Sequence, residues 1–289
     1  MSTHLPFELL ALIIDFVAAN TFIHDKNVHD TTALRQCALV STQFAVQCRR
    51  HIFSHIQISY DKPWAVSNLQ KVLDIDHPEL GSHVKVLSVT LWPPNYHPQP
   101  DINRILCKCT HVTDLAVYCH QDWHSGLDWV LDIPKGTQIA LESIIHSPTC
   151  KTLDFDGIQM PCSVFSNPLR SCAAESLSFS RRGYPLASLE VPTDKILDHG
   201  PSYLSLRCLS LIPSLIPSLL SPTFHDGRHL FDFSNLVTLW VDHRRTNVQP
   251  GVTVQLLRRT THLESLGFTL RCTCFLLCIC SRPLNIVLS

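Results

Sequence analysis

The sequence predicts an α+β protein in which a small N-terminal bundle of three helices precedes an irregular α/β solenoid built on parallel strands. Two observations lead to this expectation. Capping residues and helical apolar spacing fill the first part of the chain, and one short apolar motif then recurs seven times. We therefore divide the chain into a helical domain, a repeating body and an apolar, cysteine-rich tail, at residues 1–58, 59–270 and 271–289.

The first helix is expected to begin near Leu5. Thr3 is a capping residue type, Pro6 suits the first turn because no N–H donor is needed there, and Glu8 is favourable near the positive end of the helix dipole. Its apolar residues form a stripe too wide for one core contact, so the helix should pack on two surfaces. The two neighbouring faces consist of Leu9, Ile13 and Phe16, and of Leu10, Ile14 and Val17.

Two further helices are expected after a polar loop over residues 20–31. Asp30 or Thr31 can cap a helix over Thr32–Val40, and Ser41 can cap a third that runs as far as Ile52. Fewer than about sixty residues of this kind form a marginal core, and a binding partner commonly completes such a structure. An ordinary three-helix bundle, whose Leu and Ile residues only form a core, is the alternative.

These helices carry the residues Leu5-Pro6-x-Glu8-Leu9-Leu10, Ile13-Ile14, Leu34-x-x-Cys37-x-Leu39-Val40-Ser41-x-x-Phe44, Cys48-Arg49 and Ile52-Phe53. Their order and spacing resemble the F-box over residues 3–55, although Phe44 stands where many F-boxes have Trp and the loop over residues 20–31 is long. The resemblance implies a face that binds the Skp-type adaptor, which links F-box proteins to a cullin. We expect this face to include Leu5, Pro6, Glu8, Leu9, Ile13, Leu39, Val40 and Phe44.

The motif apolar-x-x-Leu-x-apolar recurs through the repeating body. Its leucines are Leu87, Leu115, Leu153, Leu177, Leu209, Leu239 and Leu266. In a strand, each leucine and the apolar residue two positions later would face inward together. The residues between them would face outward, at Ser88, Ala116, Asp154, Ser178, Ser210, Trp240 and Gly267, and the next outward positions include Asp156, Ile212 and Asp242. Chance recurrence in a leucine-rich chain is the alternative.

The motif resembles leucine-rich repeats, in which each unit adds one strand to a curved solenoid. The resemblance implies a strand face that holds a protein substrate, with Asp154, Ser178, Ser210, Trp240 and Asp242 as candidate contacts. Apolar spacing predicts helices over Ile102–Cys109 and Gln138–His146, whereas Pro213 and Pro217 argue against a plain helix in another connection.

Other chemistry finds little support. Lys and Arg number 23 against 24 Asp and Glu, without long runs of one sign, so we expect neither nucleic acid nor a membrane surface as partner. No hydrolase, phosphate-loop or zinc-protease motif occurs, so we expect no enzyme and no cofactor. His51 and His55 have the i, i+4 spacing of metal ligands on a helix, but lack a third ligand, so no metal is expected.

The 13 cysteines are odd in number and scattered, which is typical of reduced, mostly buried thiols in the cytosol or nucleus. The tail is an exception, with Cys272-x-Cys274 and Cys278-x-Cys280 in an apolar segment. Either this tail folds back as a last strand, or it belongs to a shortened or misread end with an uncovered edge. We favour the second, because charge-poor, β-prone edges are usually guarded.

Together these features predict a substrate-recognition adaptor of a Skp–cullin–F-box type ubiquitin ligase. The alternative is a repeat scaffold that binds proteins without any link to ubiquitin. The sequence does not identify the protein substrate.

Overall fold

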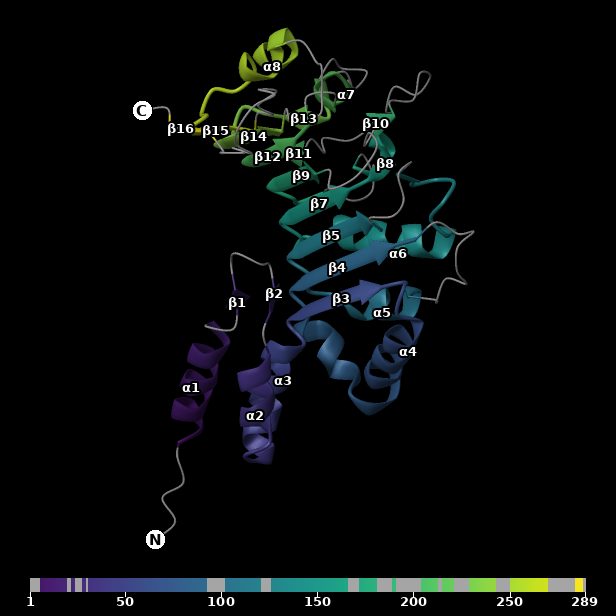
Figure 1. Ribbon diagram of the computed structural model, residues 1–289, viewed down its shortest axis with the longest axis vertical. Coiled ribbons are helices and arrows are strands. Elements are labelled where there is room, and N and C mark those ends of the chain that lie inside the picture. Colours follow the sequence, from purple (N-terminus) through teal and green to yellow (C-terminus); the bar gives the residue numbers. More distant parts are fainter. Residues whose placement is uncertain are drawn as a thin grey trace, which may run out of the picture.

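The computed structural model describes residues 6–19, 22–23, 28–29, 31–92, 102–120, 126–165, 172–180, 189–190, 204–212, 215–220, 229–242, 250–269 and 284–287. Helices and strands are mixed, and one large sheet is mostly parallel. Figure 1 shows the N-terminal helices next to β3 at one end of this sheet and the C-terminal strands at the other end.

The N-terminal part contains three helices, α1 (Phe7–Ala19), α2 (Thr32–Ala38) and α3 (Thr42–Ile52), as predicted. Ser41 caps α3, because its hydroxyl oxygen accepts a hydrogen bond from the Phe44 N–H at 3.3 Å. Thr31 occupies the N-cap position of α2, as one of the two expected candidates, but its side chain makes no capping hydrogen bond; Asp30 lies outside the described residues. The predicted polar loop contains two short antiparallel strands, β1 (Phe22–Ile23) and β2 (Val28–His29).

Nine strands form the main sheet: β3 (His55–Ser59), β4 (Val86–Leu91), β5 (Asp114–Cys119), β7 (Thr152–Asp156), β9 (Ser176–Ser180), β12 (Cys208–Leu211), β14 (Thr238–Asp242), β15 (Ser265–Thr269) and β16 (Leu284–Val287). They lie side by side in chain order. Every pair is parallel except β15 with β16, which is antiparallel. Each recurrence of the sequence motif therefore contributes one strand.

The strand register follows the motif. Leu87 pairs with Leu115, and the ladder continues through Leu153, Leu177, Leu209, Leu239 and Leu266. These leucines are buried, from 0% exposure at Leu153 to 8% at Leu266. The predicted inward face is therefore confirmed, because a shift of one residue on any strand would have turned its leucine to the opposite side.

A repeated backbone arrangement joins consecutive units. At the start of each of the seven strands that carry the motif, two successive N–H groups donate to one carbonyl oxygen of the preceding unit; for example, Lys151 and Thr152 both donate to the Thr113 carbonyl, at 2.7 and 3.0 Å. The same pair of bonds recurs on the carbonyl oxygens of Ser54, Lys85, Thr113, Lys151, Glu175, Arg207 and Val237. Backbone hydrogen bonds therefore join each of these units to the next.

The connections between strands contain α4 (Pro63–Lys71), α5 (Asn103–Lys108), α6 (Lys135–Ile145), α7 (Ile216–Leu220) and α8 (Pro250–Leu257). The predicted helices at α5 and α6 are confirmed. The connection with the two prolines contains only the five-residue helix α7, and Pro217 is its second residue, where the missing N–H has no helical acceptor; Pro213 lies outside the described residues.

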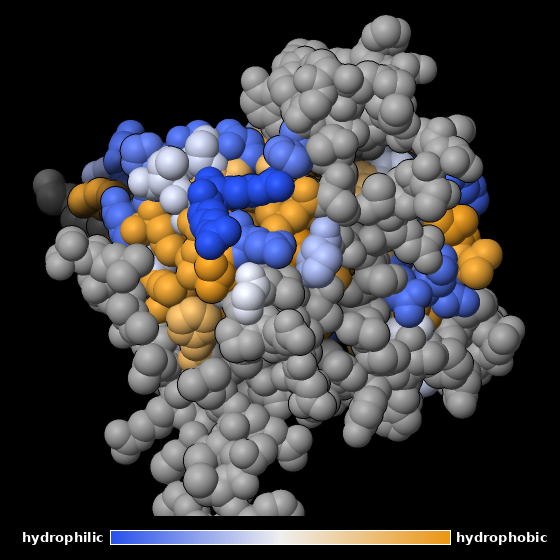
Figure 2. All heavy atoms as spheres, turned by 90° about the horizontal axis from the view of Figure 1, so that it is seen from above, coloured by the Kyte–Doolittle hydropathy of each residue, from blue (hydrophilic) through white to orange (hydrophobic). Residues whose placement is uncertain are grey.

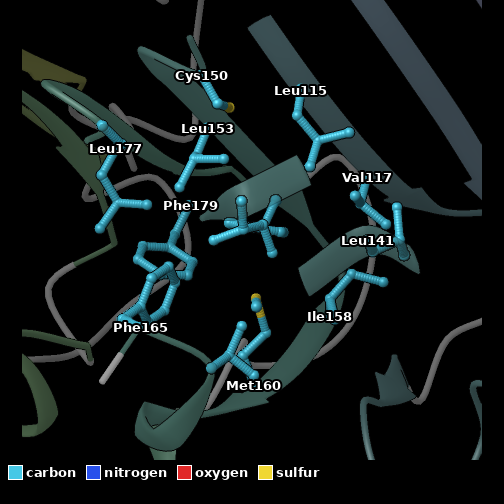
Figure 3. Close-up of a cluster of buried hydrophobic side chains, with 14 of the residues drawn as sticks. Leu115, Val117, Leu141, Cys150, Leu153, Ile158, Met160, Phe165, Leu177 and Phe179 are labelled. Carbon is cyan, nitrogen blue, oxygen red and sulfur yellow. The ribbon is translucent and has the colours of Figure 1, made fainter. Parts of the chain in front are cut away.

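Short strands flank the main sheet. β6 (Leu127–Asp128), β8 (Ile158–Pro161) and β10 (Leu189–Glu190) form a small parallel sheet, and β11 (Leu204–Ser205) pairs with β13 (Phe231–Asp232). Figure 3 shows how Leu153 and Phe179 of the main sheet converge with Leu141 of α6 and Met160 of β8. The core of the body therefore lies between the ladder of leucines and the segments that connect the strands.

The main sheet begins earlier than predicted. β3 starts at His55 and pairs in parallel with β4, so the sheet enters the region assigned to the helical domain, residues 1–58. Ile56 and Ile58 alternate with exposed Gln57, which is the strand period of two rather than the helical period. A π-helix over Val72–Asp76 and a 3-10 helix over Pro78–His83 then lead from α4 to β4.

The outer edge of β15 is covered by β16, in which Leu284 pairs with Phe268 and Ile286 pairs with Leu266. For this segment, the fold-back strand rather than the uncovered edge is what the structure shows. The cysteines Cys272–Cys280 lie outside the described residues.

Figure 2 views the molecule from the α8 end and shows hydrophilic side chains beside hydrophobic ones on the described surface.

Candidate functional site

Helix α1 has two apolar faces, as predicted. Leu10 and Ile14 are 3% and 0% exposed and form a small core with Leu34 and Cys48, separate from the core of the sheet. The neighbouring face is turned outward, with Leu9 at 48%, Ile13 at 47% and Phe16 at 72% exposure. Large apolar side chains that gather outside a core are typical of a protein-interaction surface.

A second exposed apolar site lies in the turn between α2 and α3. Leu39 is 87% exposed and Val40 is 69% exposed. The turn is held by its own backbone, since the Leu39 N–H donates to the Gln36 carbonyl at 3.1 Å and the Val40 N–H to the Cys37 carbonyl at 3.0 Å. Both side chains therefore point away from the bundle core without loss of backbone hydrogen bonding.

The remaining predicted docking residues fall into three groups. Pro6 and Glu8 are exposed, Phe44 is half-buried against the bundle core, and Leu5 lies outside the described residues. Leu12 was missed, although it is 63% exposed and its spacing from Leu9 and Phe16 fits one helix face. We use the name bundle face for Pro6, Glu8, Leu9, Leu12, Ile13, Phe16, Leu39 and Val40.

His51 and His55 do not share a helix, so the metal-ligand spacing considered for them is wrong. His51 is in the last turn of α3 and its Nε2 lies 2.8 Å from Asp15 Oδ1 of α1, whereas His55 begins β3. Helix α3 ends at Ile52, so the two residues are not one turn apart on a helix. Within the described residues, no group of three His, Cys, Asp or Glu side chains could hold a metal ion.

The outward side chains of the main sheet form the second surface, which we call the sheet face. Asp154, Ser178, Ser210, Trp240 and Asp242 are all partly exposed at the positions predicted for them. Successive outward residues form a row across the strands, because Asp154 pairs with Ser178, Ser178 with Ser210, and Ser210 with Trp240. The sheet face is therefore a continuous polar row that ends at an aromatic ring.

Trp240 owes its position to a glycine. On the adjacent strand its partner in register is Gly267, which is buried although it points outward. A Cβ atom on Gly267 would overlap carbons Cε3, Cζ3 and Cδ2 of the Trp240 ring. The indole therefore lies against the backbone of β15, and its remaining surface is partly exposed on the sheet face.

Besides Gly267, two predicted outward residues are buried. Ile212 is 4% exposed because β12 ends at Leu211, so the strand alternation does not continue to it. Asp156 is 6% exposed at the end of β7, where the chain turns at Gly157, with φ of 67°, tightly against Cys119. The sequence pattern could not reveal this, because the residues that enclose Asp156 come from other strands.

A pocket of about 340 Å³ lies at the C-terminal ends of β3, β4, β5 and β7. Asp156 lines it, together with Thr90, Tyr118 and His120. Tyr118 Oη donates to Asp154 Oδ2 at 3.1 Å, which links the pocket wall to the sheet face. No sequence motif marked this pocket, since its residues are far apart along the chain.

The described cysteines are free thiols. Burial raises the pKa of Cys109, Cys150 and Cys162 to about 12, from the ordinary value of 9.0. Cys107 and Cys208 are exposed. Thiols with raised pKa values that lie in the core contribute apolar packing rather than nucleophilic chemistry.

Comparison of the chain with protein-family models, with curated proteins and with solved structures finds no match. Within the described residues, none of the helices has both the length and the apolar character needed to cross a bilayer.

Proposed function

We propose that this chain is a substrate-recognition adaptor of a cullin-based ubiquitin ligase of the Skp–cullin–F-box type. The observation that carries the proposal is the exposed apolar side chains of the bundle face. Leu9 and Ile13 on α1, and Leu39 and Val40 after α2, stand out from the bundle at positions where the F-box resemblance expects the Skp-type adaptor to bind.

Burial of these side chains supplies the driving force for docking. Moving a Leu, Ile or Val side chain fully out of water is worth about 1.5 to 3 kcal/mol. The bundle itself has a small core of Leu10, Ile14, Leu34 and Cys48, so a partner that covers the bundle face also stabilises the fold of the helices. Ordinary surface leucines are scattered singly, whereas these belong to two neighbouring helical segments.

The sheet face serves as the substrate-binding surface in this proposal, in the manner of a leucine-rich-repeat-like solenoid. Trp240 provides a large apolar contact, and the row from Asp154 to Ser210 provides polar contacts. The chain itself breaks no bond. It raises the local concentration of substrate lysines near the ubiquitin-transfer subunits, which is catalysis by proximity.

Affinity capture of the full chain followed by mass spectrometry tests the proposal. The Skp-type adaptor and a cullin should be captured by the wild-type protein and lost with the double variant Ile13→Asp and Leu39→Asp. Ile139→Asp is the matched control, because Ile139 is 57% exposed on α6, outside the bundle face. Capture of other proteins without adaptor or cullin would favour the alternative, a repeat scaffold unrelated to ubiquitin.

A further inference from the structure

The pocket at the strand ends is continuous with the sheet face. Its lining residues Gln57, Ser59, Thr90 and Tyr118 are outward residues of β3, β4 and β5. Its volume of about 340 Å³ falls within the range of sites that hold small organic groups, and it is large enough for one long side chain. A polypeptide bound on the sheet face can therefore place a side chain in this pocket.

The charges on the sheet face have one sign. Asp114, Asp154, Asp156 and Asp242 occupy outward positions, and none of the outward positions of the described strands β3 to β15 is Lys or Arg. Asp61 and Lys62 both line the pocket, and their opposite charges cancel in the net charge of its wall. Because the whole chain has a net charge of -1, this acidic character is local to the face.

Two carboxylates on β7 have unusual surroundings. Asp156 lines the pocket and is 6% exposed. Asp154 accepts one hydrogen bond on Oδ2 from Tyr118, while its Oδ1 is enclosed and has no hydrogen-bond partner among the described residues. Asp154 itself does not line the pocket, whereas the carboxylate of Asp156 does, and a buried carboxylate favours a cationic donor beside it.

We propose that the pocket receives an arginine side chain from a polypeptide held on the sheet face. The inference rests on the proposed substrate-binding role of this face and adds the chemistry of the substrate. A guanidinium group has five donors in one plane, which suits acceptors spread over Asp156, Thr90 and Ser59. Tyr118 adds an aromatic ring to the pocket wall, and guanidinium groups stack on such rings.

Selection from a random nonapeptide library displayed on phage, with the full chain as bait, tests the inference. Peptides retained by the wild-type protein should be enriched in arginine at one position. The best peptide should bind at least tenfold more tightly than its twin with citrulline, an uncharged analogue of arginine, when both are measured by fluorescence anisotropy. Selection of no peptide, or equal affinity of the two twins, would overturn the inference.

Asp156→Asn should abolish the preference for arginine over citrulline. Asp76→Asn should keep it, because Asp76 is an exposed residue of the π-helix and does not line the pocket. Asp154 accepts the hydrogen bond that holds Tyr118 at the pocket wall, so Asp154→Asn should weaken the preference and provides a second variant if Asp156→Asn does not fold. An unchanged preference in the folded Asp156→Asn or Asp154→Asn protein would assign the arginine to another site.

Capture of the Skp-type adaptor by the same variants separates the two proposals. Loss of the arginine preference with intact adaptor capture is expected, because the pocket lies outside the bundle face. Peptide binding with arginine preference but without adaptor capture would overturn the ligase proposal and leave the pocket assignment in place.

Discussion

Gly267→Ala should destabilise the protein although it adds only one methyl group. Gly267 pairs in register with Trp240, and a Cβ atom at this position would overlap three carbons of the indole. The indole must then move away from β15. This movement exposes the β15 backbone and the ring surface, which contact each other in the wild-type protein. Inserting a methyl group into such a packed contact costs about 1 to 3 kcal/mol.

Thermal unfolding followed by circular dichroism measures the effect. For domains of 150 to 250 residues, each 1 kcal/mol corresponds to about 2 to 4 °C, so a melting temperature lower by about 2 to 12 °C is expected. Gly251→Ala is the matched control. A Cβ atom on Gly251 would meet nothing within 4 Å, and alanine is the better residue in a helix such as α8.

A double-mutant cycle isolates the contact with Trp240. In a Trp240→Ala background the overlap is absent, so Gly267→Ala should be neutral or should stabilise β15 by up to about 1 kcal/mol, because glycine is unfavourable within a strand. An equal loss of stability in both backgrounds would refute the proposed contact. Wild-type stability of the single variant Gly267→Ala would refute it as well.

Two further predictions concern the core. Leu153→Ala should lower the unfolding free energy in urea by about 2 to 5 kcal/mol, because Leu153 is 0% exposed in the middle of the leucine ladder; a loss below 1 kcal/mol would contradict that placement. A thiol reagent at pH 8 should label exposed Cys107 and Cys208 but not Cys150 or Cys162 in the folded protein. Burial raises the pKa of Cys150 and Cys162 to about 12, so the protonated thiols favour the folded state. Their contribution to the unfolding free energy should be lost as pH rises from about 9 to 12. Replacing both cysteines by Ala should reduce this pH dependence of stability.

The sequence predicted the register of the main sheet well, because one motif indicates both the alternation of a strand and the inward position of its leucine. β3 was missed because it has no leucine of the motif; Ile56 and Ile58 alone carry its alternation. The small flanking strands, such as β6 and β10, are two residues long and too short to show any period. Their positions depend on the main sheet and not on local sequence.

The candidate surfaces were predictable to different degrees. The outward residues Leu9 and Ile13 follow from the width of the apolar stripe on α1, and Trp240 follows from strand alternation. The enclosure of Asp156 depends on Gly157 and on residues of β3 to β5, which come together only in three dimensions. A pattern read along one segment contains no information about such neighbours.

The parallel ladder also fixes distances between contact points on the sheet face. Three strand steps separate β7, which carries Asp156, from β14, which carries Trp240. Trp240 shares its row with Asp154, and Asp156 lies two residues further along β7. With strands about 4.8 Å apart and about 3.3 Å per residue along a strand, the interval from Asp156 to Trp240 is roughly 16 Å, which a fully extended chain spans in about five residues. The spacing of the strands therefore sets the distance between these two contact points. A partner that fits it would be recognised by the interval between its basic residue and its apolar residue as much as by the residues themselves.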